Sequence, residues 1–303
     1  MQTILGANGT IALELSKHLL QYTDKIRQVS RNPKKANASD ELFSADLLNY
    51  QQVENAVAGS EVTYLVAGLK YETKTWQDQW PKVMKHTIDA CKKHNSKLVF
   101  FDNVYPYGLV RGKMTEETPF NPTSKKGEVR AKIAMMLLDE IKAGNLQGMI
   151  VRAADFYGPN VLLSLTHTMV TEKLNAKKGA QWIGDPKRSH SFTYTPDAGK
   201  TVAILGNTPS AFNQTWHALT SQESITGEQY VRMACEIAGQ PYKIQPLPKW
   251  GVRTLGLFVP VLREFVEMMY QYENDYFFDS SKFEKAFSIT ATSYKTGIAE
   301  TLR

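Results

Sequence analysis

The chain is poor in the features that define several protein classes. Only two of its 303 residues are cysteines, Cys91 and Cys235, and they lie far apart within helical patterns. At such positions two buried thiols in a reducing compartment are commoner than a disulfide. The six histidines form no His-x-x-x-His pair, and no Cys-x-x-Cys pair occurs. We therefore expect neither a disulfide framework nor a metal site.

Long apolar runs and continuous basic stripes are also absent. No apolar run approaches the roughly 18–20 residues that a membrane span needs. Residues 1–5 lead straight into a glycine turn without the basic region of a signal peptide, which favours a cytoplasmic protein. The formal charge is +6, but the lysine pairs are scattered among acids, so we expect no nucleic-acid partner. A small-molecule substrate, anionic in character, fits this mild positive balance.

The first half of the chain alternates short apolar segments with amphipathic helical ones. Apolar residues recur at steps of three and four from Trp76 to Cys91 and again from Gly127 to Lys142, as a helix face requires. Repeated β-α-β units predict an α/β fold, a Rossmann-type doubly wound parallel sheet with a smaller C-terminal substrate lobe. The expected strands are 2–5, 26–30, 42–45, 62–66, 98–101 and 149–151.

The alternation of short apolar segments with amphipathic helical ones ends after Pro159. We expect residues 1–160 to form the cofactor-binding core, with 188–220 returning to it, and 161–187 and 221–303 to form the smaller lobe. The aromatic tail, residues 250–278, is predicted to line that lobe or an oligomer interface. A membrane-surface helix is the weaker interpretation because the tail lacks a clean basic face, so no membrane partner is expected.

A glycine loop at the N-terminus carries the main functional signal. Gly6 follows an apolar strand, and Gly9 opens a helix whose apolar residues share one face. Gly6 permits a tight turn, and Gly9 lets the backbone approach a pyrophosphate at the helix N-terminus. A plain strand–turn–helix connection is the alternative, but it needs only one glycine. We predict a dinucleotide site that also includes the loop residues Asn8, Thr10 and Ile11.

The end of the second expected strand points to the form of the dinucleotide. NAD sites usually carry Asp or Glu about 20 residues after the loop, where the carboxylate binds the ribose. This chain has Ser30 and Arg31 there, with Lys34 and Lys35 close behind. A guanidinium attracts a 2′-phosphate, so we predict NADP as the cofactor, with NAD as the other possibility. The alternative is an ordinary solvated arginine.

Taken together, the motifs resemble those of the short-chain dehydrogenase/reductase superfamily, in its extended, nucleotide-sugar epimerase/dehydratase-like branch. The resemblance spans nearly the whole chain and rests on the order and spacing of its pieces. These pieces are Gly6-x-x-Gly9-x-x-Ala12, Ala45-Asp46-Leu47, Val66-Ala67-Gly68, Tyr107-Gly108, Arg152-x-x-Asp155-x-Tyr157-Gly158-Pro159, Phe192-x-Tyr194-x-Pro196-Asp197 and Asp279-x-Ser281-Lys282.

The resemblance implies further site residues and an assembly. Asp46 and Leu47 would bind the adenine, and Val66, Ala67 and Gly68 would pass beneath the ribose and nicotinamide. Residues 153–155, Ala153 and Ala154 among them, would border the nicotinamide. Asp197 would support the substrate lobe or, alternatively, cap the helix that follows it. The superfamily often dimerises through a helical bundle, so a homodimer is possible.

The resemblance breaks at the catalytic residues. Members of the superfamily carry Tyr-x-x-x-Lys and an upstream serine, and the ionisable tyrosine moves a proton as hydride moves. Here the expected alignment places Lys132 at the lysine, Glu128 at the tyrosine and Asn103 at the serine. A glutamate is normally ionised and cannot donate that proton. Glu128 and Lys132 are expected to form an i,i+4 ion pair, which leaves Lys132 able to reach the cofactor.

Another tyrosine could supply the acid/base group. Tyr105 follows the fifth strand, at the end where open α/β sheets bind ligands, and Asn103 beside it could donate a hydrogen bond to a carbonyl. The alternative is that Tyr105 simply packs.

Two functions remain open on the sequence. The first is an NADP-binding oxidoreductase or epimerase/dehydratase-like enzyme acting on a small or nucleotide-sugar-like carbinol or carbonyl. Asn103, Tyr105 and Lys132 would be its catalytic residues, and Arg188 and His190 would contact an anionic substrate unless they form an ordinary basic loop. The second is a non-catalytic NADP-binding sensor or scaffold, which Glu128 and Asn103 favour.

Overall fold

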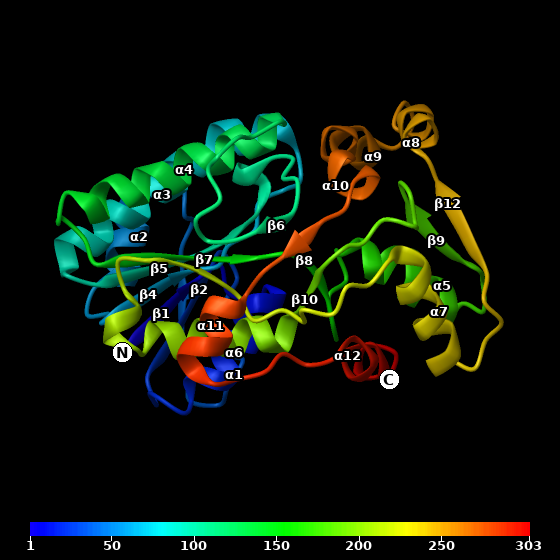
Figure 1. The fold of residues 1–303 in the computed structure, drawn as a ribbon. Helices are drawn as coiled ribbons and strands as arrows, with labels where there is room; N and C mark the ends of the chain where they lie inside the picture. The colour runs from blue at the N-terminus through cyan, green and yellow to red at the C-terminus, as the bar shows by residue number, and fades with distance from the viewer.

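The computed structural model describes residues 1–303, and its centre is a seven-stranded sheet in which every neighbouring pair is parallel. The strand order is β11-β7-β5-β4-β1-β2-β3 (Figure 1). The predicted Rossmann-type fold is confirmed. The strands are β1 (Gln2–Leu5), β2 (Ile26–Ser30), β3 (Glu41–Ser44), β4 (Val62–Leu65), β5 (Lys97–Asn103), β7 (Gly148–Ala153) and β11 (Thr215–His217).

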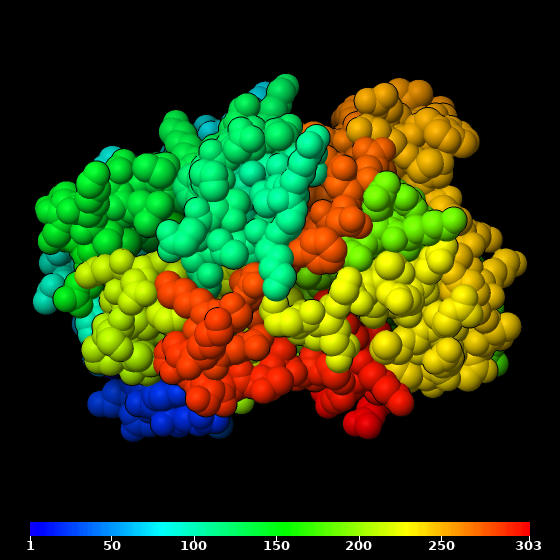
Figure 2. Space-filling view, viewed as in Figure 1, coloured from blue at the N-terminus to red at the C-terminus, as the bar shows by residue number.

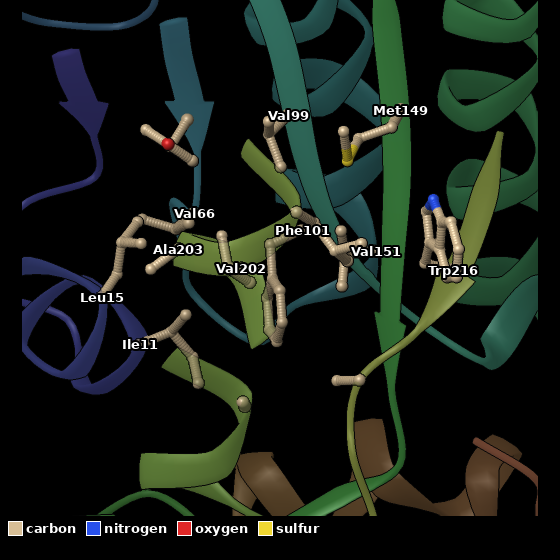
Figure 3. Close-up of a cluster of buried hydrophobic side chains, with 14 of the residues drawn as sticks. Ile11, Leu15, Val66, Val99, Phe101, Met149, Val151, Val202, Ala203 and Trp216 are labelled. Atoms are coloured by element: carbon tan, nitrogen blue, oxygen red, sulfur yellow. The ribbon is translucent and has the colours of Figure 1, made fainter. Parts of the chain in front are cut away.

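Helices cover both faces of this sheet. On one face lie α1 (Thr10–Leu19) and α6 (Thr195–Gly206), and on the other lie α2 (Tyr50–Val57), α3 (Thr73–His94) and α4 (Lys125–Lys142). Apolar side chains of α1, α6 and the sheet point toward one another, including Leu15, Phe101 and Val202 (Figure 3). The removal of these side chains from water is the main force that holds the layers together.

The second lobe is built from short elements. Three two-stranded parallel pairs join segments far apart in sequence, and a separate apolar cluster fills the lobe around Trp182 and Tyr230. The pairs are β8 (Asp155–Tyr157) with β10 (Phe192–Tyr194), β9 (Ala180–Ile183) with β12 (Ile244–Leu247), and β6 (Lys113–Met114) with β13 (Phe277–Phe278). The remaining helices are α5 (Glu172–Asn175), α7 (Gly227–Ile237), α8 (Lys249–Leu255), α9 (Pro260–Phe265), α10 (Tyr270–Glu273), α11 (Ser281–Phe287) and α12 (Tyr294–Thr301).

The chain returns to the core twice after β8. In the first return, α6 packs against α1 and β11 adds to the sheet. The second return, α11, was expected in the smaller lobe. Instead Phe283 is buried with the core side chains of α6, and Lys282 Nζ donates to the carbonyl of Thr215 at 2.8 Å. The predicted lobe of 221–303 is therefore interrupted at α11, because its apolar face covers the edge strand β11.

Candidate functional site

The glycine loop lies at the point where the strand order reverses. β1 is flanked by β2 and β4, and open α/β sheets bind ligands at the carboxyl ends of such strands. Gly6 has φ of +103°, and a Cβ there would collide with the backbone of Ala67 in the loop after β4. Only glycine fits this position without strain. The loops after β1 and β4 are thereby held side by side.

The N-terminus of α1 has no side-chain cap. Gly9 is its N-cap residue and contributes no hydrogen bond, whereas Ser124 caps α4 and Thr226 caps α7. The first N–H groups of α1 are thus left for an anion, which the positive end of the helix dipole favours. Thr10 Oγ1 donates to the carbonyl of Asn160 at 3.2 Å, which brings the loop after β8 to this end of α1. These features fit the pyrophosphate of a dinucleotide.

Asn8 ties the glycine loop to the end of β2. Its Nδ2 donates to the carbonyl of Asn32 at 2.8 Å, and its Oδ1 accepts from the backbone N–H of Lys34 at 2.9 Å. Ser30 Oγ lies 3.4 Å from the same Nδ2. The side chains of Arg31 and Lys34 are exposed and form no ion pair. Two uncommitted cations therefore stand beside the glycine loop.

The other predicted cofactor residues line the same edge of the sheet. Asp46 accepts the backbone N–H of Leu48 at 3.0 Å, and the carbonyl of Leu47 lies 3.1 Å from His86 Nδ1. A Cβ at Gly68 would meet no atom within 4 Å, so this loop is open to a ligand. Three of the predicted residues are buried: Ile11, Val66 and Ala153. Their side chains therefore pack beneath the proposed cofactor site. Ala154 follows them at the end of β7 and is also buried.

Helix α4 presents different residues to the interior from those expected. Lys132 and Glu128 are exposed and form no ion pair with each other. Lys126 and Arg130 are buried, at 0% and 4% exposure, and have the same spacing of four. Because Ser124 caps the helix by accepting from Gly127 N, positions 126 and 130 turn toward the sheet. Lys126 and Arg130 share the four-residue spacing of the Tyr-x-x-x-Lys motif, and the expected role of Lys132 at the cofactor stays a prediction.

Lys126 is held by acids from the C-terminal segment. Its Nζ lies 2.7 Å from Glu264 Oε2 and 2.9 Å from Glu267 Oε1, and it donates to Thr73 Oγ1 at 2.8 Å. Burial raises the pKa of Glu264, but the hydrogen bonds from Lys126 and Thr73 outweigh it and lower that pKa to about 2. Lys126 therefore anchors the segment rather than standing free.

Arg130 is committed to the core in a comparable way. Its Nε donates to Asp102 Oδ1 at 2.7 Å, and Arg152 Nε lies 3.3 Å from Asp102 Oδ2. The guanidinium also stacks over the rings of Trp80 and Phe100, at 4.5 and 5.0 Å from their centroids. One buried carboxylate thus serves two arginines, and neither cation of the motif is free to activate a tyrosine.

Asn103 and Tyr105 lie close together at the end of β5. Asn103 Oδ1 accepts from the backbone N–H of Tyr105 at 3.0 Å, which leaves the Nδ2 of Asn103 available to a ligand. Tyr105 is half-buried and stacks on Trp76. Desolvation, followed by the neighbouring Tyr71 and Asp155, raises the pKa of Tyr105 well above its ordinary value. Tyr105 therefore stays protonated at neutral pH, a hydrogen-bond donor and not a base.

Arg188 and His190 have separate surroundings. Arg188 is exposed and pairs with Asp185 at 3.3 Å. His190 is buried, stacks on Tyr276 with 4.3 Å between ring centroids, and places Nε2 3.0 Å from Asp155 Oδ2. The Tyr272 hydroxyl donates to the same carboxylate.

Sequence patterns do not reveal the assembly around Asp155. Its partners come from the aromatic tail, where no spacing marks Tyr272 or Tyr276. Two buried hydroxyls near it, those of Tyr71 and Tyr276, lack a hydrogen-bond partner within the protein. So does the indole N–H of Trp76, whose ring packs against Tyr71. Burial, reinforced by the charge of Asp155, raises the pKa of both tyrosines, so their hydroxyls remain donors.

No helix is both long and apolar enough to cross a membrane, and no three His, Cys, Asp or Glu side chains are arranged to hold a metal ion.

Comparison with solved structures supports the fold. The chain superposes over its full length on the UDP-glucuronic acid 4-epimerase of Bacillus cereus in complex with NAD, with a TM-score of 0.81, 17% identity and 97% of that chain covered. The UDP-glucose 4-epimerase of Thermus thermophilus, also in complex with NAD, gives a TM-score of 0.79 at 16% identity, with 100% of this chain and 98% of that chain covered.

Sequence comparison gives the family. The uncharacterized UDP-glucose epimerase YtcB of Bacillus subtilis (strain 168) is 24% identical over 177 residues, 55% of this chain and 54% of the relative. The chain thus matches about half the length of that curated relative. The model of the NAD-dependent epimerase/dehydratase family matches residues 3–215, which is more than half of the chain. The chain belongs to the NAD-dependent epimerase/dehydratase family.

Proposed function

We propose that this protein is an NADP-dependent oxidoreductase that binds its cofactor across the carboxyl edge of the central sheet. The observation that carries the proposal is the pairing of the uncapped α1 N-terminus with the end of β2, where Arg31 and Lys34 are exposed and unpaired. The first accommodates a pyrophosphate, and the second a 2′-phosphate. The two solved epimerases contain NAD, so NADP preference would be a departure from them.

The polar groups at the end of β5 suit the reduction of a carbonyl. When bound, the nicotinamide supplies the hydride. The Nδ2 of Asn103 and the protonated Tyr105 hydroxyl can donate hydrogen bonds to a carbonyl oxygen as negative charge develops there. The same raised pKa makes Tyr105 a poor base, so oxidation of a carbinol is disfavoured at this position. Addition of the hydride to the carbonyl carbon and of a proton from water to the oxygen gives the carbinol.

The substrate class follows from the relatives and from the charge of the chain. The epimerases named above act on UDP-glucose and UDP-glucuronic acid. A nucleotide sugar or a smaller anionic carbonyl compound is therefore the substrate we propose, with exposed Arg188 as a contact for its negative charge and buried His190 as a positioning group beside Asp155.

A second candidate is a non-catalytic NADP-binding sensor. One observation favours it: Lys126 and Arg130, at the positions of the family's tyrosine and lysine, are both held in buried ion pairs. A protein with this arrangement could bind the dinucleotide without turning over a substrate.

A crystal structure with NADPH bound tests the proposal and separates the two candidates. The oxidoreductase predicts the 2′-phosphate at Arg31 and the Tyr105 hydroxyl within about 3 Å of the position that would receive the hydride. A position lined only by carbon atoms would favour the sensor, and a 2′-phosphate turned away from Arg31 would contradict the NADP assignment. On a confirmed substrate, Tyr105→Phe should lower kcat by roughly 100-fold if the hydroxyl stabilises the oxyanion.

A further inference from the structure

A solvent-facing apolar tip is formed by α8, α9 and the turn between them, residues 249–265. Six large apolar side chains are exposed within twelve residues of it, while the other exposed ones are scattered over the rest of the chain. Leu257 and Phe258 in the turn are 75% and 81% exposed, and Trp250 on α8 is 73% exposed. The tip projects at the upper right of Figure 1 and forms the gold protrusion in Figure 2. Such a concentration marks an interaction surface.

The tip is held firmly by the fold. Val252 on α8 is fully buried against Ile183, Met269 and Tyr272. Beyond α9, Glu267 also accepts the backbone N–H of Lys125 at 2.8 Å, in addition to its ion pair with Lys126. The apolar side chains are therefore exposed because the helices on which they stand are anchored on the other side.

Cations outnumber acids in the tip. Residues 249–265 contain Lys249, Arg253 and Arg263 and a single acid, Glu264, which is paired with buried Lys126. Lys249 pairs with Glu273 at 2.9 Å, whereas both arginines are exposed and form no ion pair. The arginines flank the apolar turn on its two sides, one on each helix.

Exposed apolar side chains together with unpaired arginines indicate the kind of partner that the tip binds. Two copies of the tip packed face to face would bring unpaired arginines together, and the one acid in the tip, Glu264, is already paired with Lys126. An anionic lipid surface supplies negative charge at its headgroups and an apolar layer beneath them, and amphipathic helices rich in Trp, Phe, Leu and Arg bind there. We propose that the α8–α9 tip docks this protein on the surface of an anionic bilayer, with Leu257 and Phe258 inserted and Arg253 and Arg263 at the headgroups.

The proposal departs from the expectation of no membrane partner. The tail was expected to lack a basic face, but the two short helices and their turn place cations on both sides of the apolar side chains.

Tryptophan fluorescence provides a direct test. Of the five tryptophans only Trp250 is exposed, since Trp76, Trp80, Trp182 and Trp216 are buried. Vesicles of phosphatidylcholine mixed with phosphatidylglycerol should shift the emission to the blue, and vesicles of phosphatidylcholine alone should bind about tenfold more weakly. Trp250→Phe should abolish the shift while co-sedimentation persists.

Matched variants give the decisive comparison. Leu257→Ser with Phe258→Ser, and separately Arg253→Glu, should each weaken co-sedimentation with the anionic vesicles by about tenfold. Leu163→Ser, at a fully exposed apolar residue outside the tip, should leave it unchanged. Equal binding by all variants, or no binding by the wild type, would overturn the proposal. So would a concentration-dependent dimer on size-exclusion chromatography that the Leu257/Phe258 variant abolishes, since a second copy would then be the partner.

Discussion

Lys126 and Glu264 form an ion pair at the start of α4, with Nζ 2.7 Å from Oε2 and the lysine fully buried. The pair joins the Rossmann core to the segment that carries the α8–α9 tip. We propose that Lys126 occupies the position of the family's catalytic tyrosine; in this chain the residue joins two parts of the fold.

Removal of this cation should destabilise the protein. Lys126→Met would leave Glu264 and Glu267 facing each other without a partner, and breaking such a buried pair costs roughly 3–5 kcal/mol in the free energy of unfolding. Urea denaturation measures this cost. Lys125→Met, at the exposed neighbour, should change it by less than about 0.5 kcal/mol. Equal stability of the two variants would show that the ion pairs of Lys126 contribute nothing to the free energy of unfolding.

Asp102 should be equally sensitive, because it neutralises two buried guanidinium groups. Asp102→Asn retains the shape and removes the charge, so Arg130 and Arg152 would repel each other. The expected loss is on the order of 3–5 kcal/mol in thermal or urea unfolding. Asp139→Asn, exposed on α4, serves as the control. A stability near that of wild type would indicate that the arginines find another anion.

The stability should fall as the pH is lowered, in part because of His217. Its Nδ1 donates to the carbonyl of Asp279 at 2.7 Å, so Nε2 accepts from Tyr107 at 2.9 Å and the ring is neutral. Burial lowers the pKa of His217 to about 3. The unfolded chain, with a pKa near 6.5, binds more protons below that pH, so this stability is present above pH 6.5 and lost toward pH 3.

Between pH 7 and pH 5 this one histidine accounts for about 2 kcal/mol. His217→Asn should be less stable at pH 7 and should lose less on acidification. Urea titrations of both proteins at the two pH values measure the difference. Parallel losses in the two proteins would rule out His217 as a source.

The exposed pair on α4 should be dispensable for cofactor binding. Lys132→Met and Glu128→Gln each alter a side chain that faces solvent, so NADPH affinity by titration calorimetry should stay within about twofold of wild type. A loss of tenfold or more in Lys132→Met would restore the original alignment, with Lys132 at the ribose.

Local signals sufficed to predict the position of the glycine loop. A strand, a glycine turn and a helix follow one another within residues 2–19, and the loop lies where β1 ends. The catalytic half was harder because two pairs on one helix share a spacing of four, Lys126 with Arg130 and Glu128 with Lys132. A buried cation needs an acidic partner, and the partner of Lys126 is Glu264, 138 residues further along the chain. A local sequence pattern cannot reveal so distant a partner, so it does not show which pair faces inward.

The aromatic tail shows the same limit. The hydrophobicity of residues 250–278 predicts an apolar segment, but it does not indicate which of its side chains are buried within the fold. In the fold, Met268, Met269 and Tyr272 are buried, while Trp250 and Phe258 face solvent. The division depends on contacts with β9 and α4 that come from distant parts of the chain.

We propose that Arg31 makes this a site for NADP. The most direct measurement is the ratio of Kd values for NADH and NADPH, determined by titration calorimetry on the wild type, on Arg31→Glu and on Lys295→Glu, a control with the same charge change at an exposed residue of α12. Loss of one charge-assisted contact of roughly 1.5–3 kcal/mol corresponds to about a tenfold to hundredfold change in affinity. The account predicts tighter NADPH binding in the wild type and the control, and loss or reversal of that preference in Arg31→Glu. Tighter NADH binding by the wild type, or an unchanged ratio in Arg31→Glu, would contradict it.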